Sequence, residues 1–252
     1  MNFFLALIPI IAVLGVWEIY SQFSSNVFFL FSRPSEIIDN LWTNSLNGEL
    51  PQHAWITFIE SFVGLILGVG LGSILGFILL FKNSLGKIVY PYLVFLSSIP
   101  IIALAPMMII WFGIGIQMKI AIVFLSTVFV AAFQAYRGGK NIDPKDSIFF
   151  KLNNASSSQY FRMLTFPAAI DWLIQSLRLN IGFAILGAFI GEFIASDQGL
   201  GFSIMKSSGL YDVANVMSSI IYLIALTILF NFIAKLLEIN KIRVIRFLAL
   251  KI

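Results

Sequence analysis

The chain contains no cysteine, which excludes disulfides, thiol catalysis and cysteine metal sites. Its single histidine, His53, cannot form a cluster of histidine metal ligands. Charged residues are also scarce, at 11% of the chain against about 25% in an ordinary soluble domain. So few charges cannot cover a water-soluble surface for 252 residues, which excludes a soluble enzyme, a disordered tail and a coiled coil.

Apolar side chains dominate what is present. Hydrophobic residues make up 59% of the chain, phenylalanine alone occurs 26 times, and the mean hydropathy is +0.95. This composition indicates an all-α protein of the lipid bilayer, and the length suits one bundle of about five to seven spanning helices. The net charge of +4 favours a basic cytoplasmic face over a nucleic-acid partner.

Six stretches are apolar and long enough to cross a bilayer, which takes about 20 residues. They cover approximately residues 3–20, 57–81, 90–112, 119–136, 172–194 and 213–236. We expect the first to be a retained anchor, because the start MNFF carries no lysine or arginine and no small-x-small cleavage site follows.

Positive charge predicts the orientation of this bundle. Thirteen of the sixteen Lys and Arg residues fall at 82–87, at 137–171, at Arg178 or from residue 235 onward. Segments rich in lysine and arginine stay in the cytoplasm. We therefore expect six transmembrane helices with both termini and the 137–171 segment on the cytoplasmic side.

No polar linker, internal repeat or low-complexity tract divides the chain. We expect an N-terminal anchor with an outer loop over 1–53, a membrane core over 54–240 and a basic cytoplasmic tail over 241–252. Within the outer loop, the sequence SRPSEIIDNLW predicts a short helix. That helix either lies on the outer membrane surface or packs on the bundle.

The cytoplasmic segment is too long for a turn and carries signals of two helices. Asp143 can cap a first helix that has Pro144 at its first position. Asn154 can adopt the left-handed conformation that ends a helix, and Ser156 or Ser157 can cap a second one. Pro167 is expected to break the chain before the next span. The apolar anchors of this helix–turn–helix would be Ile148, Phe149, Leu152, Tyr160, Phe161 and Leu164.

No arrangement of residues predicts enzyme chemistry or a cofactor. The sequence YRGGKN at 136–141 lacks two residues of the phosphate-loop pattern, since Gln134 and Asn141 stand where glycine and serine or threonine are needed. The chain should therefore not bind ATP by itself.

Four glycines recur every four residues in the second span. Gly64, Gly68, Gly72 and Gly76 share one face of a helix, along which a neighbouring helix can approach closely. The stripe predicts tight helix packing or, as the alternative, a surface on which helices slide.

Arg178 and Glu192 are the two charges within the fifth span. They lie about 21 Å apart along one helix and cannot pair with each other. Arg178 is either an anchor at the inner interface or the partner of a loop, or else a group of the gate or path. Glu192 either makes a structural hydrogen bond or belongs to the gate or path.

Several sequences together resemble one known family. The loop and its exit read NNASSSQYFRMLTFPAAIDWLIQSLRLNIGFAILGAFIGEF, and earlier stretches include IPIIALAPMMIIWFGIG and PSEIIDNLW. In order and spacing, over about 34–240, these are similar to ABC-importer permeases of the type I fold. Within that family they resemble the nitrate, sulfonate and taurine branch.

The family carries an EAA–Gly–I-x-L-P signature in its cytoplasmic loop. Anchoring that signature on Pro167 places its glycine at Asn154 and its EAA triplet at 148–150, where Ile148, Phe149 and Phe150 now stand. The resemblance implies that the loop couples to an ATPase. The residues implied are Phe149, Phe150, Lys151, Leu152, Asn154, Ala155, Ser156, Tyr160, Phe161 and Pro167.

The resemblance further implies a permease subunit in the bacterial inner membrane, acting as a homodimer or with a paired permease. Two cytoplasmic ABC ATPase subunits would hydrolyse ATP, and an extracytoplasmic solute-binding protein would deliver the solute. That solute would be a nitrate-, sulfonate- or taurine-like anion or a thiamine-precursor-like compound.

Two other classes stay open. A secondary carrier or channel would work without an ATPase, and should show paired ionisable groups inside the membrane. A membrane scaffold would not transport at all. An ATPase gene and a binding-protein gene beside this one would favour the importer.

Overall fold

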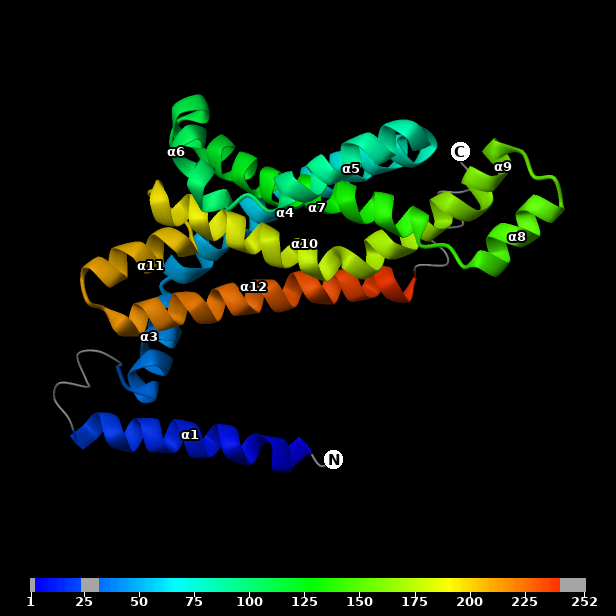
Figure 1. Ribbon diagram of the computed structural model, residues 1–252. Helices are drawn as coiled ribbons and strands as arrows, with labels where there is room; N and C mark the ends of the chain where they lie inside the picture. Colours follow the sequence, from blue (N-terminus) through cyan, green and yellow to red (C-terminus); the bar gives the residue numbers. More distant parts are fainter. Residues whose placement is uncertain (1–2, 24–31, 241–252) are drawn as a thin grey trace. The chain divides into compact units, whose positions relative to one another are not determined.

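The computed structural model describes residues 3–23 and 32–240, which form helices joined by short connections (Figure 1). The basic tail expected over 241–252 lies outside the described residues. The helices are α1 (Phe3–Phe23), α3 (Pro34–Leu46), α4 (Glu49–Phe81), α5 (Asn83–Ser97), α6 (Ile101–Phe112), α7 (Ile116–Lys140), α8 (Pro144–Leu152), α9 (Ser157–Tyr160), α10 (Phe166–Ile194), α11 (Leu200–Gly209) and α12 (Val213–Ile239).

The helices belong to two compact units. One unit comprises Met1–Thr57 and Glu192–Leu226, and the other comprises Phe58–Gly191 and Thr227–Ile252. In the larger unit a buried cluster of apolar side chains fills the space among α4, α5, α7 and α10. Its members are Leu79, Leu80, Leu93, Ala132, Tyr136 and Ala169.

Four helices of the described chain are long and apolar enough to cross a membrane. They are α4, α7, α12 and the continuous helix Ser157–Ile194 that contains α10. The pair α5 and α6 is a fifth if the two helices form one bent span, and α1 contains the shorter apolar stretch Ile11–Ser21. The all-helical membrane architecture is thus confirmed, whereas the count of six spans stays a prediction.

The expected continuous span over 90–112 is wrong in its shape. The chain forms α5 and α6 instead, bent by 90° at the intervening residues. Pro100 has an extended backbone conformation at the start of α6. A proline also disfavours helical geometry in the residue before it, here Ile99. The hydroxyls of Ser97 and Ser98 both bond back to the carbonyl of Val94, at 2.8 and 2.9 Å, and so compete with the helical ladder.

The expected break at Pro167 is also wrong. From α9 the chain passes through a π-helical turn, Phe161–Thr165, directly into α10. In that turn the amide of Phe166 donates to the carbonyl of Phe161, five residues back. A proline ring clashes with the carbonyl four residues earlier in a regular helix, and the wider π-helical turn accommodates it.

The other helix signals of this segment are confirmed. The Asp143 side chain accepts a hydrogen bond from the amide of Lys145 at 2.8 Å, and Pro144 begins α8. Asn154 is left-handed with φ of 50°. Ser156 caps α9 in a reciprocal arrangement with Gln159.

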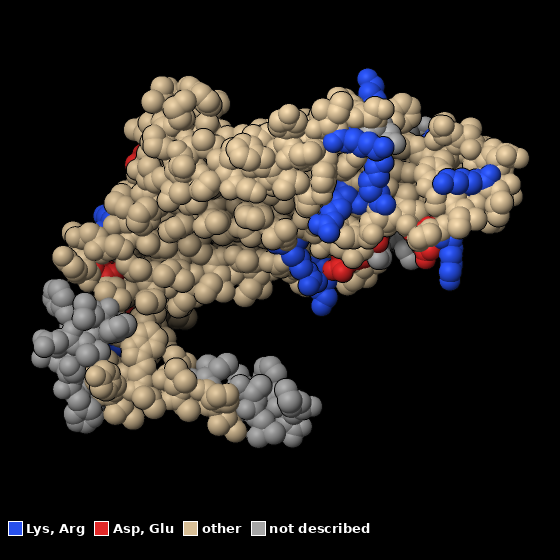
Figure 2. Space-filling model, viewed as in Figure 1, with Lys and Arg blue, Asp and Glu red and all other residues tan. Residues whose placement is uncertain are grey.

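Basic side chains gather in the larger unit at the end that carries α8 and α9 (Figure 2). This distribution predicts that α8 and α9 face the cytoplasm. Because the chain has no cysteine, single cysteines can report the side of the membrane. Asn47→Cys and Ser208→Cys should react with an impermeant thiol reagent added outside, and Asn141→Cys should react only after the cells are opened. Outside labelling of Asn141→Cys would overturn this orientation.

Candidate functional site

Three large apolar side chains of α8 point away from the rest of the chain. Ile148, Phe149 and Leu152 are 55%, 63% and 77% exposed. They occupy a helix capped at both ends and flanked by Lys145 and Lys151. Apolar groups clustered in this way mark a contact with another molecule.

The opposite side of the same segment faces a hollow of about 750 Å³. Phe150, Ala155 and Tyr160 contribute to its wall. The Tyr160 hydroxyl bonds to the Ser147 hydroxyl at 3.0 Å, and the Tyr160 ring meets that of Phe150 edge to face. These contacts fix α8 against α9.

The remaining residues expected in the coupling segment differ in exposure. Lys151 is exposed and also lines the hollow. Phe161 packs on Phe81 at 5.4 Å and on Phe166 at 6.2 Å between ring centroids, and so belongs to the core of its own unit. The outward apolar side chains of this segment are therefore those of α8 together with Met163, which is 65% exposed in the turn Phe161–Thr165.

The four glycines of α4 all lie against α7. A β-carbon at Gly64 would come within 2.5 Å of Val123, and one at Gly76 would come within 2.5 Å of Ala135. A β-carbon at Gly68 or Gly72 would overlap Thr127 or the carbonyl of Val128. The stripe thus lets α4 and α7 of one chain approach closely. At Gly70, outside the stripe, an added β-carbon would have no neighbouring atom of another element within 4 Å.

Glu192 is fully buried at the end of α10 and caps the start of α11. Its carboxylate accepts one hydrogen bond from the Thr57 hydroxyl and one from the Gly201 amide, each at 2.7 Å. The Thr57 hydroxyl in turn accepts from the Leu200 amide at 2.9 Å. A negative charge at a helix N-terminus is stabilised by the helix dipole.

Gly199 and His53 complete this network. The Gly199 amide donates to Nδ1 of His53 at 3.0 Å. Gly199 has φ of 103°, a conformation that favours glycine. A β-carbon there would also overlap the Glu192 carboxyl group, so both the backbone and the packing require glycine. Sequence reasoning noted Glu192 but missed Thr57 and His53, because nothing local in the sequence pairs residues about 140 positions apart.

Arg178 pairs with a residue that the sequence did not single out. Its guanidinium lies 3.1 Å from the carboxylate of Glu238, at the end of α12, and both side chains are exposed. An exposed pair of this kind contributes about 0–1 kcal/mol.

A second ion pair, between Glu60 and Lys119, was also missed. The Lys119 ammonium lies 3.4 Å from the Glu60 carboxylate, and the two side chains are 5% and 0% exposed. Lys119 is buried in α7, and its stem passes Gly191, where a β-carbon would sit 3.1 Å away.

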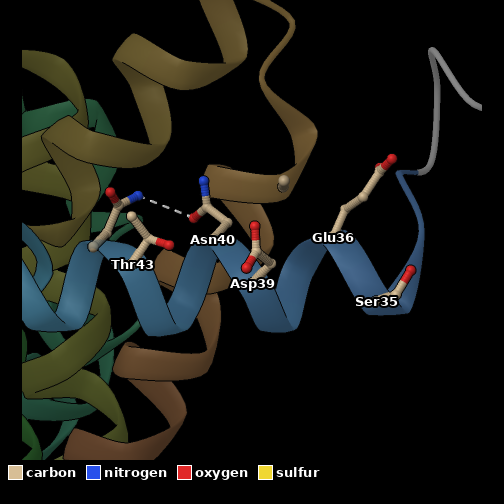
Figure 3. A pocket seen from close by; sticks show the side chains of 7 residues that line it. Ser35, Glu36, Asp39, Asn40 and Thr43 are labelled. Atoms are coloured by element: carbon tan, nitrogen blue, oxygen red, sulfur yellow. Dashed lines mark hydrogen bonds between the residues drawn. The ribbon is translucent and has the colours of Figure 1, made fainter.

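A polar hollow of about 480 Å³ lies along α3 in the smaller unit. Figure 3 shows Ser35, Glu36, Asp39, Asn40 and Thr43 along its wall. On another side of α3 the apolar Ile38, Trp42 and Leu46 are exposed, whereas Ile37 is buried and its carbonyl accepts from Ser218 of α12. Both expectations for this helix thus have support: it packs on α12 and also presents an apolar face.

The fold and its segments define a class of protein: a polytopic, all-helical membrane protein with a helical segment outside its spans. The chain belongs to the family of binding-protein-dependent transport system inner membrane components, whose model matches residues 68–239.

Its relatives agree with that assignment. The chain is 31% identical to the formylaminopyrimidine transport permease protein ThiX of Halalkalibacterium halodurans, over 85% of each chain. It is 27% identical to a probable ABC transporter permease of Haemophilus influenzae, over 87% of this chain and 89% of that one. It is 25% identical to a putative aliphatic sulfonates permease, SsuC, of Bacillus subtilis, over 90% of this chain and 82% of that one.

A solved structure shows the same fold. An inward-facing conformation of the MetNI methionine ABC transporter matches with a TM-score of 0.65 at 18% identity, over 80% of this chain and 97% of that one. The protein is thus a multi-pass permease subunit of an ABC importer in the bacterial inner membrane. It is not itself an enzyme, since ATP hydrolysis belongs to a separate subunit.

Proposed function

We propose that this permease, together with a second copy or a paired permease, forms the path for a small solute that an external binding protein delivers. Two relatives bear the names of the solute classes expected from the sequence, formylaminopyrimidine and aliphatic sulfonates. The solute is accordingly a thiamine-precursor-like compound or a sulfonate- or taurine-like anion.

The observation that carries this proposal is the outward apolar face of α8. Ile148, Phe149 and Leu152 have no cover within the described chain, and α8 lies outside the spanning helices. The partner that fits is a cytoplasmic ATPase subunit with an apolar groove that receives this helix. A helix laid into such a groove is a recurrent mode of recognition.

The continuity of the chain then explains how motion would reach the membrane. The Tyr160–Ser147 bond and the ring contact of Phe150 hold α8 against α9, and α9 continues through the π-helical turn into α10. Closure of the ATPase pair would pull on α8, and this rigid connection would move α10. At the other end of α10, the Glu192 network would carry the movement into α11.

The buried pair of Glu60 and Lys119 is the one observation that favours a secondary carrier, since such carriers hold paired ionisable groups inside the membrane. A carrier of this kind would accumulate solute in liposomes without ATP. An importer would not.

Purification from the native membrane distinguishes the two functions. We expect an affinity-tagged chain, extracted in mild detergent, to bring with it an ABC ATPase subunit in equal amount, and the complex to transport only with ATP and the loaded binding protein. Recovery of the chain alone, together with ATP-independent uptake, would contradict the proposal.

A further inference from the structure

A cavity opens where the chain bends between α5 and α6. It has a volume of about 440 Å³, within the size range of small-molecule sites, and α7 and α10 form its other walls. All of these elements belong to the larger unit. The bend itself leaves non-helical backbone between two apolar helices, a feature that membrane proteins tolerate where it borders protein or a water-filled space.

The wall of this cavity is mostly apolar and carries no charged side chain. Leu104, Phe129 and Phe183 are among its apolar members, and its polar side chains are three serines. Ligand pockets typically combine such an apolar wall with a few polar groups that orient the ligand.

The three serines present acceptors. The hydroxyls of Ser97 and Ser98 donate to the carbonyl of Val94, and that of Ser126 donates to the carbonyl of Ile122 at 2.8 Å. Each hydroxyl already donates its single hydrogen to a backbone carbonyl, so its oxygen can only accept a further hydrogen bond.

Donors come from the first turn of α6. The first amides of a helix have no partner four residues back. In α6 the Ala103 amide donates to the Pro100 carbonyl at 2.9 Å, and Pro100 provides no side-chain cap for the amides of Ile101 and Ile102. Ile101, the first residue of α6, lines the cavity. The cavity thus offers hydrogen-bond acceptors at the bend and on α7, a donor at the start of α6, and apolar surface elsewhere.

We propose that this cavity holds the transported solute, and that the solute is a small uncharged heterocycle of the pyrimidine type. A flat ring would lie against the leucine and phenylalanine side chains, while its amino groups and ring nitrogens would pair with the serine oxygens and the α6 amides. The inference rests on the function proposed above and selects between its two solute classes.

A sulfonate fits the same cavity poorly. Its full negative charge would leave water for an apolar wall without a cationic side chain, which is costly. The first turn of α6 offers only about half an elementary charge of compensation. An uncharged ring has no such penalty.

A cysteine in the cavity wall tests the proposal on the whole transporter. The complex of permease, ATPase and binding protein is placed in nanodiscs with Ser98→Cys as its only permease cysteine, and its rate of reaction with a methanethiosulfonate reagent is measured. We expect saturating formylaminopyrimidine to slow the reaction at least tenfold and ethanesulfonate to leave it unchanged. The matched control is Ser84→Cys, an exposed serine in the first turn of α5 that does not line the cavity, whose rate should not respond to either solute.

Filling the cavity gives a second measurement. Leu104→Trp should lower ATP-driven uptake of the pyrimidine at least tenfold while the amount of co-purified ATPase stays the same. Ile110→Trp, on the same helix at a 76% exposed position outside the cavity, should change neither quantity.

The outcomes separate this inference from the function on which it rests. Protection of Ser98→Cys by ethanesulfonate, or by neither solute, would overturn the inference, as would full pyrimidine uptake by Leu104→Trp. If instead the wild-type chain brought down no ATPase and its uptake needed no ATP, the importer function itself would fail.

Discussion

Replacing Leu152 with aspartate should detach the ATPase subunit and leave the permease folded in its membrane. Leu152 is the most exposed of the three apolar residues on α8, so its replacement disturbs little within the chain. At the contact with the ATPase, an unpaired carboxylate would be buried, and the loss of such an anchor costs about 2 kcal/mol or more, roughly thirtyfold in affinity. The measurements are the amount of ATPase recovered with the tagged permease and the ATP turnover that the loaded binding protein stimulates in liposomes.

Two further variants sharpen this experiment. Ser158→Asp adds the same charge at an exposed position of the neighbouring α9 and should change neither quantity. Ala155→Asp places the charge in the wall of the hollow behind α8, where it should lower both coupling and the yield of folded chain. Normal ATPase recovery and normal stimulation in a stably inserted Leu152→Asp variant would show that α8 is not the coupling element.

Gly68→Leu should prevent the chain from reaching its folded form. A β-carbon there overlaps the Thr127 side chain and lies 3.0 Å from the backbone carbonyl of Phe124, which cannot move without shifting α7. Forcing such volume into a packed interface costs about 1–3 kcal/mol or more, a large share of the stability of a typical protein. The yield of monodisperse protein after detergent extraction measures the effect.

The same helix provides the control for this substitution. Gly70 has open space around its α-carbon, so Gly70→Leu should give nearly the yield of the wild type. Gly68→Ala, which adds only the β-carbon, should fall between the two. Equal yields of Gly68→Leu and Gly70→Leu would remove the close approach of α4 and α7 as a determinant of folding.

Local features of this fold could be predicted from the sequence because their causes are local. The caps at Asp143 and Ser156 and the left-handed turn at Asn154 follow from the chemistry of single side chains near the backbone. Apolar length likewise located the spanning helices, and the resemblance of ordered motifs led to the family.

The structural effect of each proline could not be predicted from the sequence in this way. Pro91 and Pro106 lie inside helices, Pro100 stands at a 90° bend, and Pro167 follows a π-helical turn. The residue type is the same, and the outcome depends on the neighbouring backbone.

The buried pairs depend on distance in three dimensions. Glu60 contacts Lys119 of α7, and Thr57 contacts Glu192 of α10. Each contact depends on how α4 is aligned along its axis with the neighbouring helix. No spacing within the sequence predicts these partners. The role of a charged residue that has no charged neighbour along its own span therefore cannot be inferred from the sequence pattern alone.

The π-helical turn at Phe161–Thr165 has a consequence for chain length. It holds one residue more than a regular helical turn between the segment with α8 and the helix α10. Removing one residue there would restore the regular ladder and rotate everything before it by about 100° relative to α10. The direction in which Leu152 and Phe149 point relative to α10 therefore depends on this single inserted residue.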